Sequence, residues 1–344
     1  MNIKKLVKKE VSLLKAYNAK EVPCRIKLDA NESPYGFNAN LESVTQCRTN
    51  RYPDPEAKIL RGLIAKDIGL KPWNILQGNG SDELIYYIVT TFGGPVLYPV
   101  PTFSMYGIIS QALGEKNIAI PLDREFDLDM EKIFCAIRKI KPKLIFLSSP
   151  NNPTGNCFSA DRILKIVETF KGIVIVDEAY QPFSSEKGFL PLLGDYKNLV
   201  IMRTLSKIGL AALRVGFLIA DTEVIEEVNK VRLPFNVNSL SQSVAVTALN
   251  NKKQLKYFIK SIISERVRLF KEMGKINGIK PFPSEANFIL FKVRDPDFVY
   301  KILFNKGILV RNTKDIVKNS LRVTVGTPDE NNAFLEALMD LSRL

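Results

Sequence analysis

The sequence of 344 residues contains no histidine. Without imidazole the chain cannot build a Ser–His–Asp triad, use histidine as a general acid or base, or form the histidine-based metal sites of most zinc enzymes. Proton transfer must therefore be carried by lysine, tyrosine, carboxylate or cysteine side chains, or by a bound cofactor. We predict no metal site, and cofactor chemistry is favoured.

Cysteine is also scarce. Cys24, Cys47, Cys135 and Cys157 lie far apart, without the paired spacing of a zinc ribbon or the density of a disulfide framework. Reduced cysteines indicate a cytoplasmic protein. The charged N-terminal segment has no uninterrupted apolar core of a secretory signal, and no apolar run is long enough to span a bilayer. We predict a cytoplasmic protein that does not bind membranes.

The N-terminal segment carries apolar residues at helical spacing. Ile3, Leu6, Val7, Leu13 and Leu14 suit one face of an amphipathic helix. We expect this helix to pack on the protein itself or on a partner subunit.

Positive charge exceeds negative charge, with 49 Lys and Arg against 36 Asp and Glu and a net charge of +13. Such a balance can mark nucleic-acid binding, but the basic residues are scattered and no recognised nucleic-acid-binding motif is present. The excess favours instead a site that attracts anionic metabolites. We predict no nucleic-acid partner.

Between residues 70 and 220, short apolar segments alternate with amphipathic ones. This alternation is typical of a parallel sheet covered by helices on both faces. The expected strands are rich in Val, Ile, Leu and Phe, as doubly buried strands are. They are Val96–Tyr98, Leu144–Ser148, Ile173–Asp177, Leu199–Arg203 and Val215–Ala220, with helices such as Asp82–Thr91 and Ala160–Phe170 between them.

The pattern changes after Asp221. A charged helical stretch over residues 222–275, interrupted near Pro234, precedes strands expected at 287–293 and 321–325. We therefore predict an α/β chain, with a mostly parallel sheet covered by helices on both faces in a large domain and with a smaller α+β domain. The expected bounds are 45–235 for the large domain, and 1–44 with 236–344 for the small one.

A glycine-rich segment, Gly78–Glu83, follows an apolar pair and opens a predicted helix. Its backbone N–H groups and the helix dipole suit a phosphate, and Ser81 or Asp82 is expected to cap the helix. Taken alone, the segment is better explained by an ordinary capped helix after a glycine turn. Glu83 stands where the dinucleotide-binding fingerprint requires a glycine, so that fingerprint is excluded.

Three more polar segments follow predicted strands. Asn152 lies between two prolines in Ser148–Gly155, Asp177 ends an apolar strand, and Lys207 ends the segment Arg203–Lys207. Singly they are explained by a turn, a helix-capping aspartate and a solvated lysine. Because ligands of open α/β sheets bind at the carboxyl ends of the strands, we expect the segments to meet there.

Together these side chains suit pyridoxal phosphate. A nucleophilic Lys207 would form a Schiff base with the cofactor's aldehyde. Asp177 would keep the ring nitrogen protonated, so that the ring can accept electrons. Asn152 and Tyr180 would hydrogen-bond the ring oxygen. The combination is more specific than any of its parts.

The sequence resembles the pyridoxal-phosphate-dependent aminotransferases of fold type I, and among them the histidinol-phosphate aminotransferase family. The resemblance covers nearly the whole chain, in order and in spacing. The matching segments are LDANESPYG (28–36), RYPDP (51–55), QGNGSDE (77–83), YPVPTFSMY (98–106), SPNNPTG (149–155), VDEAY (176–180), RTLSK (203–207), LRVGF (213–217), PFNVNSLSQ (234–242) and LRVTVGT (321–327).

The resemblance implies a role for each matching site residue. Lys207, Asp177 and Tyr180 would be the catalytic residues, and Lys207 would also carry the cofactor. Phe103 would stack on the cofactor ring, and Asn152 would contact the ring oxygen. The residues implied for the cofactor phosphate are Gly80, Ser81, Asp82, Ser206 and Arg214.

The resemblance also implies partners. Tyr52 would reach the cofactor of a neighbouring subunit, which requires a homodimer with shared active sites. Arg322 would grip the anionic groups of both substrates, with Asn31 and Tyr17 as further substrate contacts. The implied reaction is transamination between histidinol phosphate and 2-oxoglutarate, with glutamate as product, in histidine biosynthesis.

Two departures from the family pattern bear on the substrate. The segment from Lys207 to Arg214 is one residue short, so Arg214 would reach the phosphate by a shifted turn. Ala333 stands where some relatives carry a second phosphate-binding arginine. An aromatic or broad-range aminotransferase therefore remains an alternative, and a phosphothreonine decarboxylase a more distant one.

Overall fold

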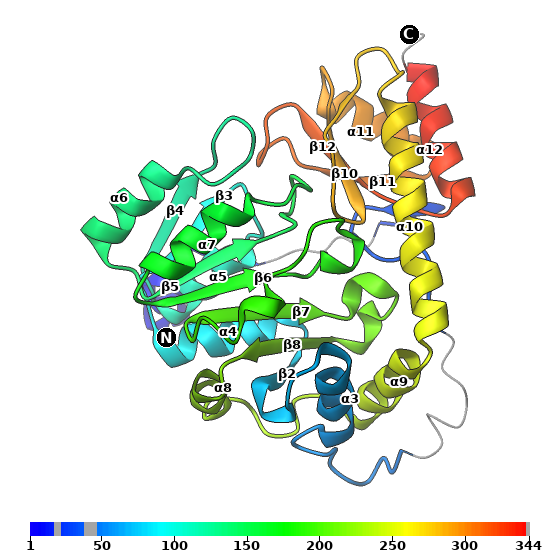
Figure 1. Cartoon of the computed structure of the whole chain (residues 1–344). Helices are drawn as coiled ribbons and strands as arrows, with labels where there is room; N and C mark the ends of the chain where they lie inside the picture. The colour runs from blue at the N-terminus through cyan, green and yellow to red at the C-terminus, as the bar shows by residue number, and fades with distance from the viewer. Residues whose placement is uncertain (17–21, 38–46, 342–344) are drawn as a thin grey trace.

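Two separate sheets organise the chain (Figure 1). The computed structural model describes residues 1–16, 22–37 and 47–341. Seven strands build the larger sheet, in the order β2-β8-β7-β6-β5-β3-β4. Their bounds are β2 Ile75–Asn79, β3 Val96–Val100, β4 Asn117–Pro121, β5 Leu144–Ser148, β6 Ile173–Asp177, β7 Leu199–Thr204 and β8 Val215–Ala220.

The larger sheet is buried on both faces. Leu144 and Phe146 of β5 pack into one apolar cluster, whereas Ile145 and Leu147 pack into another. Successive side chains of a strand point to opposite faces, so each face contributes its own core. The helices around this sheet are α3 Lys58–Ile68, α4 Ser81–Phe92, α5 Met105–Leu113, α6 Met130–Ile140, α7 Ala160–Thr169, α8 Thr222–Asn229 and α9 Ser239–Asn250.

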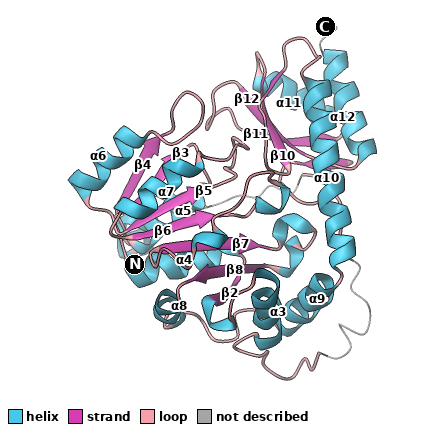
Figure 2. Ribbon diagram, viewed as in Figure 1, coloured by secondary structure: helices cyan, strands magenta, loops and turns pink. Residues whose placement is uncertain are grey.

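A smaller mixed sheet, with strand order β1-β11-β12-β10-β9, lies beside the first (Figure 2). Strand β1 comes from the N-terminal segment and pairs in parallel with β11. Helix α10 (Lys252–Met273) runs along both parts of the molecule. The other elements here are β1 Ile26–Leu28, β9 Lys280–Pro281, β10 Phe288–Lys292, β11 Ile308–Asn312, β12 Ser320–Thr324, α11 Pro296–Asn305 and α12 Pro328–Leu341.

The predicted fold class is confirmed, with one correction to the sheet. Strand β8 runs antiparallel to both of its neighbours, β2 and β7. Only residues 205–214 connect β7 to β8, and they form two 3-10 helices, η5 (Ser206–Ile208) and η6 (Ala211–Leu213). A parallel neighbour would need a longer crossover, so this short connection reverses the chain direction. The other six strands of this sheet all run in one direction, because β2 and β7 are both antiparallel to β8 and the remaining pairs are parallel.

Two helix predictions also need correction. The stretch after Asp221 breaks near Pro234, as expected, but it breaks again at Asn251, whose side chain caps α10 by accepting from Gln254 N. The N-terminal segment forms two short pieces, η1 (Ile3–Leu6) and α1 (Lys9–Ser12), instead of one amphipathic helix. Short 3-10 helices also lie at η2 Pro72–Asn74, η3 Gln181–Phe183 and η4 Leu190–Leu192.

The N-terminal piece lies against the larger sheet's helices. Gln111 Nε2 of α5 donates to the carbonyl of Glu10 at 3.0 Å. The side chains of Ile3, Leu6 and Leu13 stay exposed. Within the described part of the chain, no helix combines the length and the apolar character that crossing a membrane requires.

Candidate active site

Lys207 lies just beyond the carboxyl end of β7. The strand ends at Thr204, and η5 then carries Lys207 with its side chain half-buried. Its Nζ atom lies 5.8 Å from the centre of the Tyr180 ring. Gly209 ends the turn at φ 98°, where a Cβ would lie 2.6 Å from the carbonyl oxygen of Tyr35. Only glycine therefore lets the N-terminal loop approach the lysine turn this closely.

Asp177 ends β6 and is 4% exposed. One carboxylate oxygen accepts from the Tyr106 hydroxyl at 2.6 Å, and the other accepts from Ala179 N at 3.0 Å. Burial raises the Asp177 pKa to about 6, against the hydrogen bonds from Tyr106 and Ala179 and the charge of Lys207. A buried carboxylate is costly without a cation, so this group is suited to a positively charged partner.

Tyr106 was not assigned a role from the sequence. It is fully buried on α5, stacks on Phe146 with ring centres 4.8 Å apart, and meets Phe103 edge to face at 5.6 Å. The sequence signal for this role is weak. It consists of a tyrosine three residues after Phe103, and a tyrosine hydroxyl needs a hydrogen-bond partner when it is buried. The partner, Asp177, is 71 residues away.

The N-terminus of α4 meets Arg214. The helix is capped by Gly80, at φ 80°, and no side chain caps it, so the predicted capping by Ser81 or Asp82 is wrong. Glycine wins because this backbone conformation is nearly closed to residues with a Cβ. A Cβ at Gly80 would lie 2.5 Å from Arg214 Nη2.

Arg214 itself adopts a left-handed conformation, at φ 54°, and pairs with Asp82 at 3.3 Å. The shortened segment after Lys207 therefore still brings this guanidinium to the start of α4. Ser206 begins η5, the same turn that carries Lys207, and accepts a hydrogen bond from the Thr204 hydroxyl at 2.9 Å. Free helix N–H groups beside a guanidinium form an anion site.

Arg322 reaches the site from the smaller sheet. Its Nη1 donates to Asn152 Oδ1 at 2.5 Å, and its Nη2 donates to the carbonyl of Asp29 at 2.7 Å. The guanidinium carbon lies 5.1 Å from the centre of the Phe288 ring. Two sequence-predicted residues, Arg322 and Asn152, are thus in direct contact.

Asn31 connects the N-terminal loop to Tyr180. Its side-chain nitrogen donates to the Tyr180 hydroxyl at 2.9 Å, and its backbone N–H donates to Thr324 Oγ1 at 3.0 Å. Asn31 is buried and has a φ of 54°, a left-handed conformation that asparagine tolerates better than most residues. The loop is therefore fixed to both sheets.

Three other residues named from the sequence are Tyr52, Ala333 and Tyr17. Tyr52 is 81% exposed and stacks on Phe235 with ring centres 4.6 Å apart. Ala333 lies on α12 and packs against the core of the smaller sheet. Tyr17 falls outside the residues that the structure describes.

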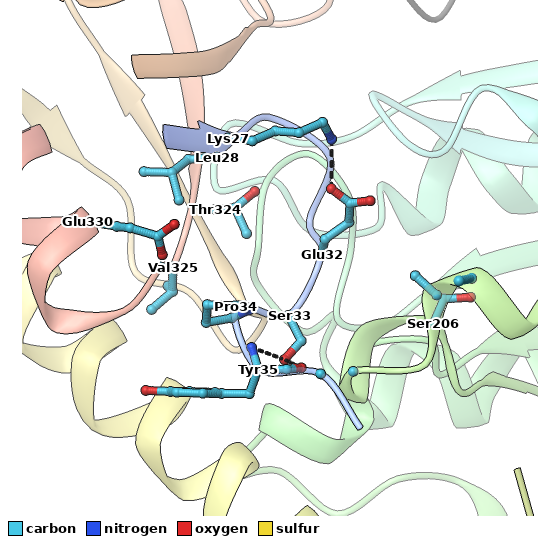
Figure 3. A pocket seen from close by; sticks show the side chains of 15 residues that line it. Lys27, Leu28, Glu32, Ser33, Pro34, Tyr35, Ser206, Thr324, Val325 and Glu330 are labelled. Atoms are coloured by element: carbon cyan, nitrogen blue, oxygen red, sulfur yellow. Dashed lines mark hydrogen bonds and ion pairs between the residues drawn. The ribbon is translucent and has the colours of Figure 1, made fainter. Parts of the chain in front are cut away.

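A cavity of about 350 Å³ lies beside the site, between the two sheets (Figure 3). Ser206, the residue before Lys207, lines it on one side, and Thr324 and Glu330 line it on the other. Lys27 and Glu32, paired at 2.6 Å, also line it. Both parts of the molecule therefore border the space next to the lysine.

The arrangement can hold a phosphorylated aromatic compound with a cationic ring nitrogen. Asp177 offers the buried negative charge, the start of α4 with Arg214 offers the phosphate site, and Lys207 offers an amine. Arg322 lies at the small-sheet side, where it can bind a second anion.

Known proteins resemble this chain over nearly its whole length. Residues 25–338 match the family model "Aminotransferase class I and II". The chain is 41% identical to the histidinol-phosphate aminotransferase of Caldanaerobacter subterraneus subsp. tengcongensis, over 98% of this chain and 99% of that protein. It is 43% identical to that of Aquifex aeolicus, over 97% of each chain.

Solved structures share the fold. The histidinol-phosphate aminotransferase from Sinorhizobium meliloti, in complex with pyridoxal-5'-phosphate, superposes with a TM-score of 0.87 at 23% identity, over 98% of this chain and 97% of that one. The L-threonine-O-3-phosphate decarboxylase from Porphyromonas gingivalis superposes with a TM-score of 0.81 at 22% identity, over 93% of this chain and 100% of that one. The fold alone therefore does not separate these activities.

Proposed function

The chain belongs to the class I and II aminotransferases, and from this we propose that it transfers an amino group between histidinol phosphate and 2-oxoglutarate in histidine biosynthesis. The observation that carries the proposal is the meeting of an amine, a buried carboxylate and an anion site at one sheet edge. These are Lys207, Asp177, and the start of α4 with Arg214.

The described residues fit pyridoxal phosphate. The phosphate would be held by the N-terminal turn of α4, which begins at Gly80, and by Ser206 and Arg214. Asp177 would face the ring nitrogen, and Phe103 would stack on the ring. When bound, the cofactor supplies an electron sink that stabilises negative charge at the substrate Cα.

Lys207 would bind the cofactor covalently and would also move protons. Its amine would take the proton from the substrate Cα and return it to C4′ of the cofactor. Asp177 would keep the ring nitrogen protonated, and its burial would make that ion pair stronger than it would be in water. Asn152 and Tyr180 would hydrogen-bond the ring oxygen.

Arg322 binds the anionic end of each substrate. Its planar guanidinium can pair in the same way with a carboxylate or with a phosphate, as two alternating substrates require. The hydrogen bonds from Arg322 to Asn152 and to the Asp29 carbonyl hold the guanidinium in place before substrate arrives. Asn31 orients the Tyr180 hydroxyl, and Tyr17 is proposed as a further substrate contact.

We propose that the protein is a homodimer with shared active sites. Support comes from the exposed rings of Tyr52 and Phe235, which stack on each other, and from the exposed side chain of Leu233 two residues before Phe235. Stacked exposed rings favour a protein interface. In that dimer Tyr52 would reach the phosphate of the partner's cofactor.

Two further statements belong to the proposal. The division into a large domain of residues 45–235 and a small domain of residues 1–44 and 236–344 is supported by the two sheets, whose strands fall within those ranges. A cytoplasmic location is supported by the free thiols of Cys24, Cys135 and Cys157.

An aromatic or broad-range aminotransferase remains the second candidate, because Ala333 offers no guanidinium and packs instead against the small-sheet core. The test is the rate of amino transfer to 2-oxoglutarate from histidinol phosphate, phenylalanine and phosphothreonine, with Lys207→Ala as the inactive control. We expect the largest kcat/KM with histidinol phosphate. A larger value with phenylalanine, or release of carbon dioxide from phosphothreonine, would overturn the assignment.

A further inference from the structure

A phenol lies behind the carboxylate that is proposed to face the cofactor. The Tyr106 hydroxyl donates to Asp177 Oδ2 at 2.6 Å, and both side chains are buried. Burial and the negative charge of Asp177 hold the Tyr106 pKa well above its usual range, so the phenol stays protonated and acts as a donor. The phenol therefore remains available as a hydrogen-bond donor to Asp177 at neutral pH.

The phenol is one of two donors that fix Asp177. The other is the backbone N–H of Ala179, which bonds Oδ1 at 3.0 Å. A hydrogen bond donated to a carboxylate favours its charged form, whereas burial disfavours it. For Asp177 these effects oppose each other, since burial raises the pKa to about 6 and both donors lower it. Loss of the phenol would therefore raise the Asp177 pKa further.

The same side chain supports a second residue of the site. The Tyr106 ring lies between Phe146, stacked at 4.8 Å, and Phe103, edge to face at 5.6 Å. Phe103 is the residue proposed to stack on the cofactor ring. The ring of Tyr106 thus supports Phe103 while its hydroxyl holds Asp177.

We propose that Tyr106 is a positioning residue that keeps Asp177 charged and oriented for the cofactor's ring nitrogen. This inference rests on the proposed function, because it requires pyridoxal phosphate at this site. The hydroxyl acts through Asp177, and the ring acts through Phe103. Nothing else in the reaction is assigned to Tyr106.

Other charged groups also act on Asp177. Lys207, from η5, lowers its pKa, and Asp82, from the first turn of α4, raises it. Tyr180, which follows β6, acts on the phenol of Tyr106. A Tyr106→Phe variant keeps Lys207 and Asp82 and loses only the hydroxyl, with its hydrogen bonds to Asp177 and Ser148.

The test is the dissociation constant of pyridoxal phosphate as a function of pH for the wild type and for Tyr106→Phe, measured on the full chain by visible absorbance. Below the pKa of Asp177 the carboxyl is protonated and no longer attracts a protonated ring nitrogen, so affinity falls on acidification. We expect this fall to begin about one pH unit higher in Tyr106→Phe, because a hydrogen bond to a charged group is lost.

Tyr98→Phe is the matched control. Tyr98 is a partly buried tyrosine in the same aromatic cluster, with its ring centre 6.4 Å from that of Tyr106, and its pKa is raised by burial alone. Removing its hydroxyl should leave the pH profile of cofactor affinity unchanged. Equal profiles for Tyr106→Phe and wild type, or equal shifts in Tyr106→Phe and Tyr98→Phe, would overturn the inference.

A fluorinated tyrosine at position 106 provides a second test if Tyr106→Phe does not fold. It keeps the ring and the hydroxyl but is the more acidic phenol and the stronger donor, so the fall in affinity should move to lower pH. An unchanged or upward-shifted profile would contradict the inference. A wild type that binds no pyridoxal phosphate at all would instead refute the proposed function itself.

Discussion

Arg322 and Asn152 form a hydrogen bond of 2.5 Å that joins the smaller sheet to the larger one at the site. Arg322 belongs to β12, and Asn152 follows β5. The arginine also bonds the backbone of Asp29 at 2.7 Å, so the N-terminal segment is held by the same side chain. The residue proposed to bind substrate anions is therefore already oriented by two other parts of the chain.

Replacement of Arg322 by lysine should lower kcat/KM by about 100-fold for both substrates, because a point charge cannot replace the planar fork that pairs with carboxylate or phosphate. Cofactor affinity should stay unchanged, since Arg322 is not proposed to touch the cofactor. Steady-state kinetics and cofactor titration measure the two quantities.

Arg311→Lys is the control for this prediction. Arg311 is the register partner of Arg322 on β11, but it is exposed. It should retain wild-type kinetics. If Arg322→Lys retained them as well, its role as the substrate-binding arginine would be wrong.

Asp177→Asn should stabilise the cofactor-free protein above neutral pH. The Asp177 pKa is raised by burial to about 6, so folding favours the protonated acid and the wild type loses stability as pH rises from about 4 through about 6. About two pKa units correspond to about 3 kcal/mol. The difference in the free energy of unfolding between variant and wild type should grow by about that amount between pH 4 and pH 7, measured by urea denaturation. A constant difference would show that Asp177 is not destabilised by burial.

Gly80→Ala should weaken cofactor binding at least about tenfold, since its backbone conformation is nearly exclusive to glycine and its Cβ would displace the Arg214 guanidinium. Gly69→Ala is the matched control. Gly69 also has a positive φ, of 72°, but no atom lies within 4 Å of its Cβ position. It should cost about 1 kcal/mol of stability without changing cofactor affinity. Equal affinities for the two variants would remove Arg214 and Gly80 from the phosphate site.

Subunit mixing tests the proposed role of Tyr52. Lys207→Ala and Tyr52→Ala homodimers should each be weakly active or inactive. A mixed dimer would contain one site that has both Lys207 and the Tyr52 of the other subunit, so activity should return on co-expression. No recovery, in a mixture shown to contain mixed dimers, would mean that Tyr52 does not serve the partner's site.

The sequence predicted the strands best where the chain is continuously apolar. The bounds of Leu144–Ser148 and Ile173–Asp177 were predicted correctly, because doubly buried strands leave a clear run of apolar residues. The direction of β8 was not predicted, since an apolar run looks the same in either direction and only the short connection after β7 decides it.

The site was harder to predict than the sheet. Gly80, and not Ser81, caps α4, because a backbone conformation that the sequence does not reveal outweighs side-chain capping preference. Tyr106 acquires its partner only through the fold, which brings α5 beside the end of β6. Long-range contacts of this kind leave no local pattern in a single sequence.

The central claim is that Lys207 holds pyridoxal phosphate and that histidinol phosphate is the amino donor. The most direct test is one half-reaction, in which cofactor-loaded protein is mixed with histidinol phosphate and the visible absorbance of the lysine-bound cofactor is followed. The account predicts rapid loss of that absorbance, its recovery on addition of 2-oxoglutarate, and no such absorbance in Lys207→Ala. Loss of the absorbance with phenylalanine but not with histidinol phosphate would contradict the account.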